Sequence, residues 1–404
     1  MKKIAFVVQR YGLEVNGGAE MECRMYAERL TDRYEVHVLT SRAIDYITWK
    51  NEYAAGEEML NGVHVHRFSV AHPRVPADFD AINGRFLQGF LEPDEEEQWV
   101  EEQGPYLPEL INYLKAHEAE YEAFLFCTYL YYPTCMGVKA VAKKAITIPT
   151  AHDEPFLRMR IFDDVFQKPK AIFYNTAEEE KFVESKYHNA AIRSGIGGAG
   201  VVLPENVSPD AFREKYGFTN YLLYVGRIDE GKACDVLFRY FQEYKKRNPG
   251  DLKLVLMGKS VIPIPEDEDI VSLGFVSEED KYNGMAAAQM LVLPSRFESL
   301  SIVVLESLAL SVPVVVNGVC EVLHGHCTKS NAGLYYKNYF EFEAAINYLL
   351  EHKDVHDAMG VNGVRYVEEN YRWDVIINRL DQLIRYVAEA TAESEAAQKE
   401  EKSE

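Results

Sequence analysis

The chain has 404 residues, of which 47% are hydrophobic and 26% are charged, as in an ordinary soluble globular protein. A chain of this length is expected to form two domains, each with its own core. The formal net charge of −21 disfavours nucleic acid as a partner and gives no general attraction to anionic lipid. The apolar run after the first lysines is too short for a signal peptide or a membrane-spanning helix. We therefore expect a cytoplasmic protein with at most a peripheral contact at the inner face of a membrane.

The six cysteines are dispersed and include no CxxC pair. Cys320 and Cys327 enclose His324 and His326, but this spacing fits no common zinc pattern. The pattern predicts buried or incidental thiols, no disulfides and no metal site.

Predicted strands and helices alternate along the first half of the chain, which is typical of an α/β protein with parallel sheets. The predicted strands are residues 3–9, 34–40, 63–70, 123–128, 145–149 and 171–175. The predicted helices run from the Gly17-Gly18 pair to residue 30 and over residues 93–115, 133–143 and 177–187. Residues 195–200 are glycine-rich, but a strand before them and a helix after them are missing from the predicted elements. We therefore predict a flexible junction loop and a polar linker to residue 216, not a dinucleotide fingerprint.

The second half repeats the same alternation. Its predicted strands are residues 221–225, 253–257, 270–273, 290–293 and 312–316. Its predicted helices are residues 233–246, 277–288, 301–310, two within 340–370, and 373–390. Residues 391–404 have no apolar periodicity, and we expect them to be a disordered acidic tail.

This pattern predicts two Rossmann-like domains, residues 1–197 and 198–372, followed by a helix at 373–390. Two such sheets place a crevice between them, and ligands bind beyond the carboxyl ends of the strands. Each candidate group below follows a predicted strand.

Glu298 lies in a predicted strand-to-helix turn, and Glu306 lies inside the helix that follows. Ser299 or Ser301 can cap that helix, whose first amides favour an anion such as phosphate. A carboxylate there would repel phosphate, so a functional Glu298 should accept hydrogen bonds from hydroxyls. Hydroxyls beside a phosphate suit a nucleotide sugar. The alternative, a capped helix with two solvated glutamates, is favoured by the spacing alone.

The turn after the strand at 221–225 carries Arg227 and Lys232. Arginine offers a planar fork to phosphate oxygens and lysine a point charge, so the two could balance a diphosphate without a metal ion. Taken alone, the turn is better explained by surface charges that pair with Asp229 and Glu230.

Two turns in the first half are further candidates. Gly17 and Gly18 let backbone amides approach an anion at a helix start, although many α/β turns need glycine. His152 and Asp153 follow the strand at 145–149 and could orient hydroxyls or share a proton. A loop histidine beside a helix-capping aspartate is an equally good interpretation.

Taken in order, these pieces resemble the family 4 glycosyltransferases of the GT-B fold. The matching segments are Gly17-Gly18-Ala19-Glu20, His152-Asp153, Val225-Gly226-Arg227 with Lys232, Glu298-x7-Glu306, Pro313-Val314-Val315 and Asn331-Ala332-Gly333-Leu334. The likeness spans nearly the whole chain, and the ordered set is highly specific.

The resemblance implies a retaining, metal-independent transfer of a sugar from a UDP- or GDP-sugar to a glycan, lipid-linked or small-molecule acceptor. It implies no cofactor besides this co-substrate, and a place in surface polysaccharide or glycoconjugate synthesis. The first domain would bind the acceptor, the second the nucleotide sugar, and the helix at 373–390 would cross back to the first domain.

The resemblance also implies residue roles. Arg227 and Lys232 would hold the diphosphate and stabilise the leaving group, helped by amides near Ser299 and Leu300 and by the Gly17-Gly18 loop. Glu298 would contact the donor sugar and Glu306 the ribose. His152 would lie over the reacting sugar, and Asp153 on the acceptor side.

Two departures from the family pattern stand out. The family often has glycine after the first glutamate, where this chain has Ser299-Leu300-Ser301, so the donor-sugar pocket is expected to differ in shape. A Pro-Asn-Gly-Val-Asp signature at the domain junction is replaced by residues 198–204, which affects the hinge and part of the nucleotide contacts. The competing hypotheses are a GT-B epimerase or hydrolase and a nucleotide-sugar-binding protein without turnover. The misplaced glycine pattern disfavours a nicotinamide oxidoreductase.

Overall fold

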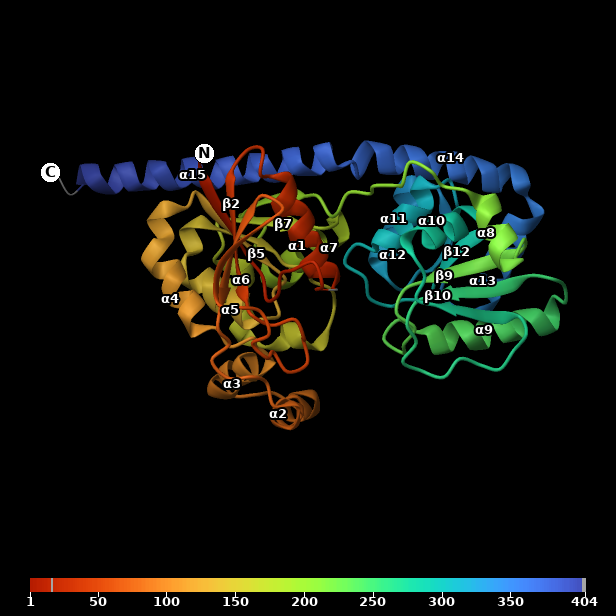
Figure 1. Ribbon diagram of the computed structural model, residues 1–404, viewed down its shortest axis with the longest axis horizontal. Helices are drawn as coiled ribbons and strands as arrows, with labels where there is room; N and C mark the ends of the chain where they lie inside the picture. The colour runs from red at the N-terminus through yellow and green to blue at the C-terminus, as the bar shows by residue number, and fades with distance from the viewer. Residues whose placement is uncertain (16, 402–404) are drawn as a thin grey trace. The chain divides into compact units, whose positions relative to one another are not determined.

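The computed structural model of the protein describes residues 1–15 and 17–401 (Figure 1). The chain divides into two compact units. The N-terminal unit contains Met1–Gly197 and Ile377–Glu404, and the C-terminal unit contains Gly198–Ile376. Among the described residues, no helix combines the length and the apolar character needed to cross a membrane.

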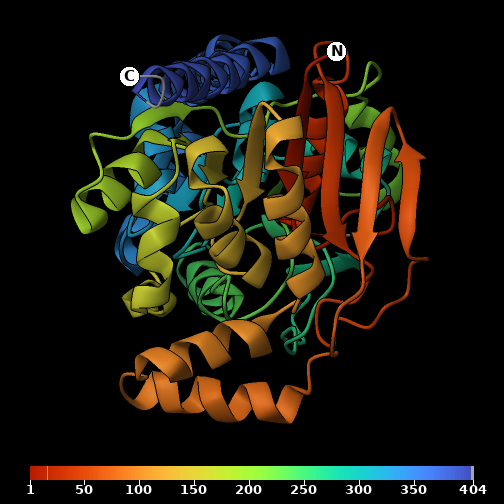
Figure 2. The ribbon, with the colours of Figure 1, turned by 90° about the vertical axis from the view of Figure 1, so that its left-hand side faces the viewer.

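The N-terminal unit is built on a sheet of eight strands in the order β3-β4-β2-β1-β5-β6-β7-β8, and all neighbours are parallel except β3 and β4. The strands are β1 Lys3–Val7, β2 Glu35–Ser41, β3 Gly56–Leu60, β4 Val63–Phe68, β5 Ala123–Cys127, β6 Ala145–Ile148, β7 Ala171–Tyr174 and β8 Arg193–Ile196. The consecutive residues Ile4 to Val7 are fully buried, because helices cover both faces of the sheet (Figure 2).

Seven helices belong wholly to this unit in the described residues. They are α1 Gly18–Arg29, α2 Pro76–Gln88, α3 Pro93–Gln103, α4 Pro108–His117, α5 Tyr132–Ala140, α6 Asp163–Gln167 and α7 Ala177–Tyr187. Four short 3-10 segments accompany them: η1 Glu118–Glu120, η2 Ala142–Lys144, η3 Pro155–Arg158 and η4 Arg160–Phe162. Helices α2 and α3, both orange, pack side by side (Figure 2).

The single helix predicted over residues 93–115 is two helices, α3 and α4. Gly104 has a φ of 70°, and Pro105 follows it, so the chain leaves the helical conformation there. Strand β3 and helix α2 are not among the predicted elements.

The glycine-rich junction is not a flexible loop throughout. Gly195 lies in β8, so a strand does precede these glycines. A Cβ on Gly197 would lie 2.1 Å from the Phe173 ring, and one on Gly200 would lie 2.7 Å from the Trp373 ring. Close packing against aromatic rings therefore explains these two glycines. The linker predicted to reach residue 216 ends in a helix, α8 Pro209–Tyr216.

The C-terminal unit has a fully parallel sheet in the order β11-β10-β9-β12-β13-β14. Its strands are β9 Tyr221–Val225, β10 Lys253–Met257, β11 Ile270–Gly274, β12 Met290–Leu293, β13 Val314–Asn317 and β14 Gly333–Tyr336. Besides α8, its helices are α9 Cys234–Arg247, α10 Glu278–Ala287, α11 Ile302–Ala309, α12 Glu321–Ser330, α13 Tyr339–Glu351 and α14 Lys353–Asn370. Strand β14 and helix α12 were not predicted.

The last helix, α15 Trp373–Glu401, begins in the C-terminal unit and belongs to the N-terminal unit from Ile377 onward. There the Tyr34 hydroxyl donates to Asp381 at 2.7 Å. The helix extends beyond the predicted end at residue 390, whereas a disordered tail was expected from there. The tail is rich in alanine, glutamate and lysine, which are strong helix formers, and it has no glycine or proline. Residues 402–404 of the predicted tail lie outside the described residues.

Candidate functional site

Two predicted site residues meet at the carboxyl end of the C-terminal sheet. Lys232 follows β9 and Glu298 follows β12, and these strands are hydrogen-bonded neighbours. The Lys232 Nζ lies 2.6 Å from the Glu298 Oε1. The lysine side chain is 33% exposed and the glutamate 13%, so the pair borders solvent. A charged ligand at this edge of the sheet can therefore compete for either member.

Arg227 lies in the same turn as Lys232. Its Nε donates to Asp229, whose other carboxylate oxygen accepts the Lys232 backbone N–H at 2.7 Å. The Arg227 side chain is nevertheless 62% exposed. Asp229 therefore stabilises the turn while the guanidinium stays at the surface. The pairing of Arg227 with Asp229, expected from surface charges alone, does occur.

The loop between β12 and α11 is fixed by a residue that sequence reasoning did not assign to the site. His326, on α12, is fully buried, and its Nε2 lies 2.7 Å from the backbone oxygen of Leu300. Its Nδ1 lies 3.1 Å from the Tyr366 hydroxyl. The sequence drew attention to His326 only through the spacing of the nearby cysteines, and nothing in it links residue 326 to residue 300. All six cysteines are buried free thiols, as predicted.

The start of α11 differs from the prediction. Ser301 occupies the N-cap position with a φ of 64°, but no side chain caps the helix. The Ser301 hydroxyl is buried and has no hydrogen-bond partner among the described residues. The expectation that Ser299 or Ser301 caps this helix is therefore wrong. Its first backbone amides lack the side-chain acceptor that usually occupies such a position.

Glu306 lies one to two turns into α11 and is turned toward α10. Its Oε1 accepts from Lys281 Nζ at 2.9 Å and from the Tyr282 hydroxyl at 2.7 Å. Burial and the neighbouring carboxylate raise the pKa of Tyr282. No contact between Glu298 and Glu306 is found in the described part of the chain, so the two glutamates have separate surroundings.

In the N-terminal unit, Gly17 and Gly18 mark the start of α1 directly after the loop that follows β1. A Cβ on Gly17 would lie 2.1 Å from the Glu20 Oε2, so glycine leaves room for that carboxylate. Glu20 forms a buried ion pair with Arg10, with the Arg10 Nη2 at 2.6 Å. Packing therefore gives Gly17 and Glu20 a structural role, while Gly18 has open space around it.

His152 and Asp153 lie in the loop after β6. The His152 side chain is 31% exposed, and its Nδ1 lies 3.8 Å from the Glu154 carboxylate. Asp153 is exposed and caps no helix, since the next segment, η3, has Glu154 at its N-cap position. The capping alternative for Asp153 is therefore excluded.

A buried carboxylate behind this loop was missed by the sequence reasoning. Glu179, on α7, accepts the Ala151 backbone N–H at 2.5 Å and the Asn175 backbone N–H at 2.7 Å. Burial raises its pKa to about 8. Thr176 and Glu179 form a T-x-x-E pattern, which could have indicated the start of α7 but not the bond to the His152 loop.

Comparison with known proteins bears on this arrangement. Residues 219–352, within the C-terminal unit, match the family model described as Glycosyl transferases group 1. Sucrose-phosphate synthase from Thermosynechococcus elongatus has a similar structure, with a TM-score of 0.70 and 15% identity over 96% of this chain and 100% of that one. The chain has the GT-B fold. The structure of HepE from Anabaena in complex with UDP-glucose is also similar, with a TM-score of 0.65 and 14% identity over 98% of this chain and all of that one.

Sequence relatives are matched over shorter regions. The N-acetylgalactosamine-N,N'-diacetylbacillosaminyl-diphospho-undecaprenol 4-alpha-N-acetylgalactosaminyltransferase of Campylobacter jejuni is 35% identical over 120 residues, which make up 28% of this chain. The chain thus spans 31% of that relative's length. The GT-B fold expected from the sequence is confirmed.

Proposed function

We propose that this GT-B protein is a retaining family 4 glycosyltransferase that moves a sugar from a nucleotide diphosphate sugar to an acceptor. The observation that carries the proposal is the pairing of Lys232 with Glu298 at 2.6 Å on neighbouring strands, in a region that matches the glycosyltransferase family model. A cation for a diphosphate and an acceptor for sugar hydroxyls then lie side by side.

The leaving diphosphate is stabilised by Lys232 and by the exposed guanidinium of Arg227. The first amides of α11, beside Ser299 and Leu300, have no side-chain cap and supply further donors to an anion. In the absence of ligand, Glu298 neutralises Lys232. A bound diphosphate takes over this lysine, and the Glu298 carboxylate then accepts hydrogen bonds from the donor sugar.

Glu306 is proposed to contact the ribose. Its Oε1 already accepts two hydrogen bonds, so the other carboxylate oxygen would receive the ribose hydroxyl. In the N-terminal unit, Gly17 and Gly18 are proposed to assist donor binding, His152 to act at the reacting sugar, and Asp153 on the acceptor side.

The donor is proposed to be a UDP- or GDP-sugar, used without a metal ion at the diphosphate because two cations balance its charge. The structurally similar HepE binds UDP-glucose in its crystal structure, which supports UDP. The acceptor is proposed to be a glycan, a lipid-linked sugar or a small molecule in surface polysaccharide or glycoconjugate synthesis. The Campylobacter relative, named for a lipid-diphosphate acceptor, supports the lipid-linked class.

A nucleotide-sugar panel tests the proposal. Thermal stabilisation identifies the donor, and donor turnover is then measured with and without candidate acceptors. We expect slow hydrolysis alone, faster transfer with an acceptor, and an anomeric configuration in the product that matches the donor by NMR. Glu298→Gln should greatly reduce this turnover in a folded protein.

Three other outcomes contradict the proposal. Free sugar or an epimer as the only product would indicate a hydrolase or an epimerase. Tight donor binding without any product would indicate a binding protein. Wild-type transfer by folded Glu298→Gln would overturn the site assignment.

A further inference from the structure

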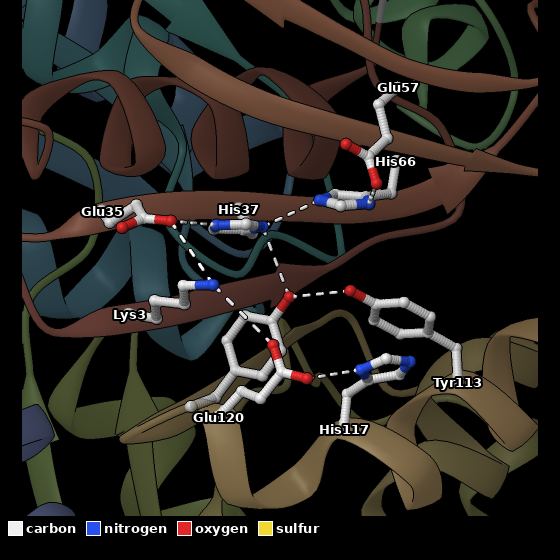
Figure 3. Close-up of polar contacts among 9 residues, drawn as sticks. Lys3, Glu35, His37, Glu57, His66, Tyr113, His117 and Glu120 are labelled. Atoms are coloured by element: carbon white, nitrogen blue, oxygen red, sulfur yellow. Dashed lines mark hydrogen bonds and ion pairs between the residues drawn. The ribbon is translucent and has the colours of Figure 1, made fainter.

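A second group of titratable side chains lies in the N-terminal unit, near the amino ends of β1, β2 and β4 (Figure 3). The loops with Gly17 and His152 follow the carboxyl ends of strands of this sheet. The group therefore lies toward the opposite edge of the sheet from those loops. Its members are Lys3, Glu35, His37, Glu57, His64, His66, Tyr113, His117, Glu120 and Tyr121.

Two buried histidines connect two glutamates in this group. The Glu35 Oε1 lies 3.1 Å from His37 Nε2, and His37 Nδ1 lies 2.8 Å from His66 Nε2. The other nitrogen of His66, Nδ1, lies 3.0 Å from Glu57. Both rings are more than nine-tenths buried. The result is a continuous line of polar contacts from Glu35 to Glu57.

This line has three contacts, but the two neutral imidazoles supply only two protons for them. Three contacts join the four groups, and each needs one proton between its two heavy atoms. Two neutral imidazoles supply one N–H each. The Tyr121 hydroxyl, 3.3 Å from His37 Nδ1, adds a neighbour but does not change the count. One contact must therefore hold an extra proton or another cation.

The extra proton or cation is best placed between Glu35 and His37. Glu57 is 70% exposed, so a cation beside it would remain largely in water. Glu35 is only 33% exposed, and it contacts the buried ring of His37.

A third side chain, His64, completes this end. The His64 ring stacks on His37 with centroids 4.8 Å apart. One ligand atom from each of Glu35, His37 and His64 lies within 4.8 Å of the other two. In a tetrahedral zinc site, bond lengths near 2.1 Å place ligands about 3.4 Å apart, so binding requires the stacked His64 ring to turn until one of its nitrogens faces Glu35 and His37.

We propose that Glu35, His37 and His64 bind a divalent transition-metal ion, with zinc as the best match to two imidazoles and one carboxylate. His66 and Glu57 then orient His37 from behind, as partners of metal-bound histidines commonly do. A water molecule fills the fourth position.

The ion joins β2 to β4 and has a structural role in the N-terminal unit. Lys3 lies 3.6 Å from Glu35 and 3.7 Å from Glu120. When the ion binds Glu35, this lysine keeps Glu120 as its partner. Its three ligands all belong to the N-terminal unit and are not among the residues proposed to bind the diphosphate.

Zinc binding to the full chain tests the proposal. The chain is stripped with a chelator and dialysed, and Zn²⁺ is added while binding is measured by calorimetry and metal content by mass spectrometry. We expect one ion per chain and a higher unfolding temperature with zinc. Co²⁺ in place of zinc should give the strong visible absorption of tetrahedral nitrogen and oxygen coordination.

Three variants locate the ion. His64→Gln and Glu35→Gln change side chains that are not fully buried, and each should weaken zinc binding by at least about tenfold. His117→Gln is the matched control, because His117 also pairs with a glutamate, Glu120 at 2.6 Å, but is not one of the three ligands. It should bind zinc as the wild type does.

Two results would overturn the proposal. The first is a wild-type chain that neither binds zinc in the micromolar range nor gives a tetrahedral Co²⁺ spectrum. The second is equal zinc affinity in the wild type, His64→Gln and Glu35→Gln. Because the first result needs no variant, it stands even where a variant fails to fold.

Discussion

The carboxyl ends of the two sheets use charge in opposite ways. In the C-terminal unit, Lys232 pairs with Glu298 and Arg227 with Asp229 at the border with solvent. In the N-terminal unit, Arg10 and Glu20 are paired and buried, with side-chain exposures of 7% and 8%. A pair that keeps contact with water can exchange its partner for a ligand, whereas a buried pair that loses one member leaves an uncompensated charge. The first arrangement is suited to binding and the second to holding a loop.

The largest expected effect comes from breaking the buried pair. Arg10→Met leaves the Glu20 carboxylate without its cation, and we expect a loss of about 3 to 5 kcal/mol in the free energy of unfolding. Urea denaturation followed by circular dichroism measures it. The double variant Arg10→Met/Glu20→Met should recover much of the loss. A loss below about 1 kcal/mol in the single variant would contradict a structural role for this pair.

Breaking the exposed pair should affect activity and spare stability. Lys232→Ala removes a charge from the leaving diphosphate, and we expect kcat to fall by roughly 10² to 10³. The matched control is Lys245→Ala, which removes a lysine paired with Asp269 at 3.1 Å near the amino end of β11. The control should keep its kcat. Equal kcat values for the two folded variants would remove Lys232 from the site.

The buried Glu22, on α1, should make the stability of the N-terminal unit depend on pH. Burial raises its pKa from 4.5 to about 7 in the folded chain. The unfolded chain therefore releases this proton first, and stability falls as the pH rises from 4.5 to about 7. Glu22 accounts for about 3 kcal/mol of this loss, and Glu22→Gln should remove that part, while the buried Glu179, whose pKa is raised to about 8, keeps its own. Unfolding free energies across this range test this, and parallel pH curves for the wild type and the variant would contradict it.

The smallest expected effect concerns His326, which we consider a positioning residue. His326→Phe removes the contact to the Leu300 carbonyl, and we expect a loss of about 1 to 3 kcal/mol in stability. The displaced loop should raise the donor KM more than it lowers kcat. His326→Gln keeps a hydrogen-bond donor, so its donor KM should lie between those of the wild type and His326→Phe. An unchanged KM in folded His326→Phe would limit this histidine to a role in stability.

Much of the fold was predictable because it depends on local patterns. The strands at residues 221–225, 253–257 and 290–293 and the helix at 177–187 have the predicted bounds. Apolar runs closed by glycine or proline leave few alternatives there. The pattern was weak in β3, whose residues are mostly exposed, and in α12, where histidines and small residues replace a clear apolar face. These two elements depend on their neighbours and were missed.

The sequence by itself determined the two α/β halves and placed Arg227, Lys232, Glu298 and His152 after strands, because hydrophobic periodicity and turn residues are local properties. Only the tertiary structure decided which of these groups meet. Lys232 and Glu298 are 66 residues apart in the chain and come together because β9 and β12 are neighbours in the sheet. The bonds from His326 to Leu300 and from Glu179 to Ala151 likewise depend on packing between distant segments. Strand order and burial create these contacts, and residue spacing alone does not specify either.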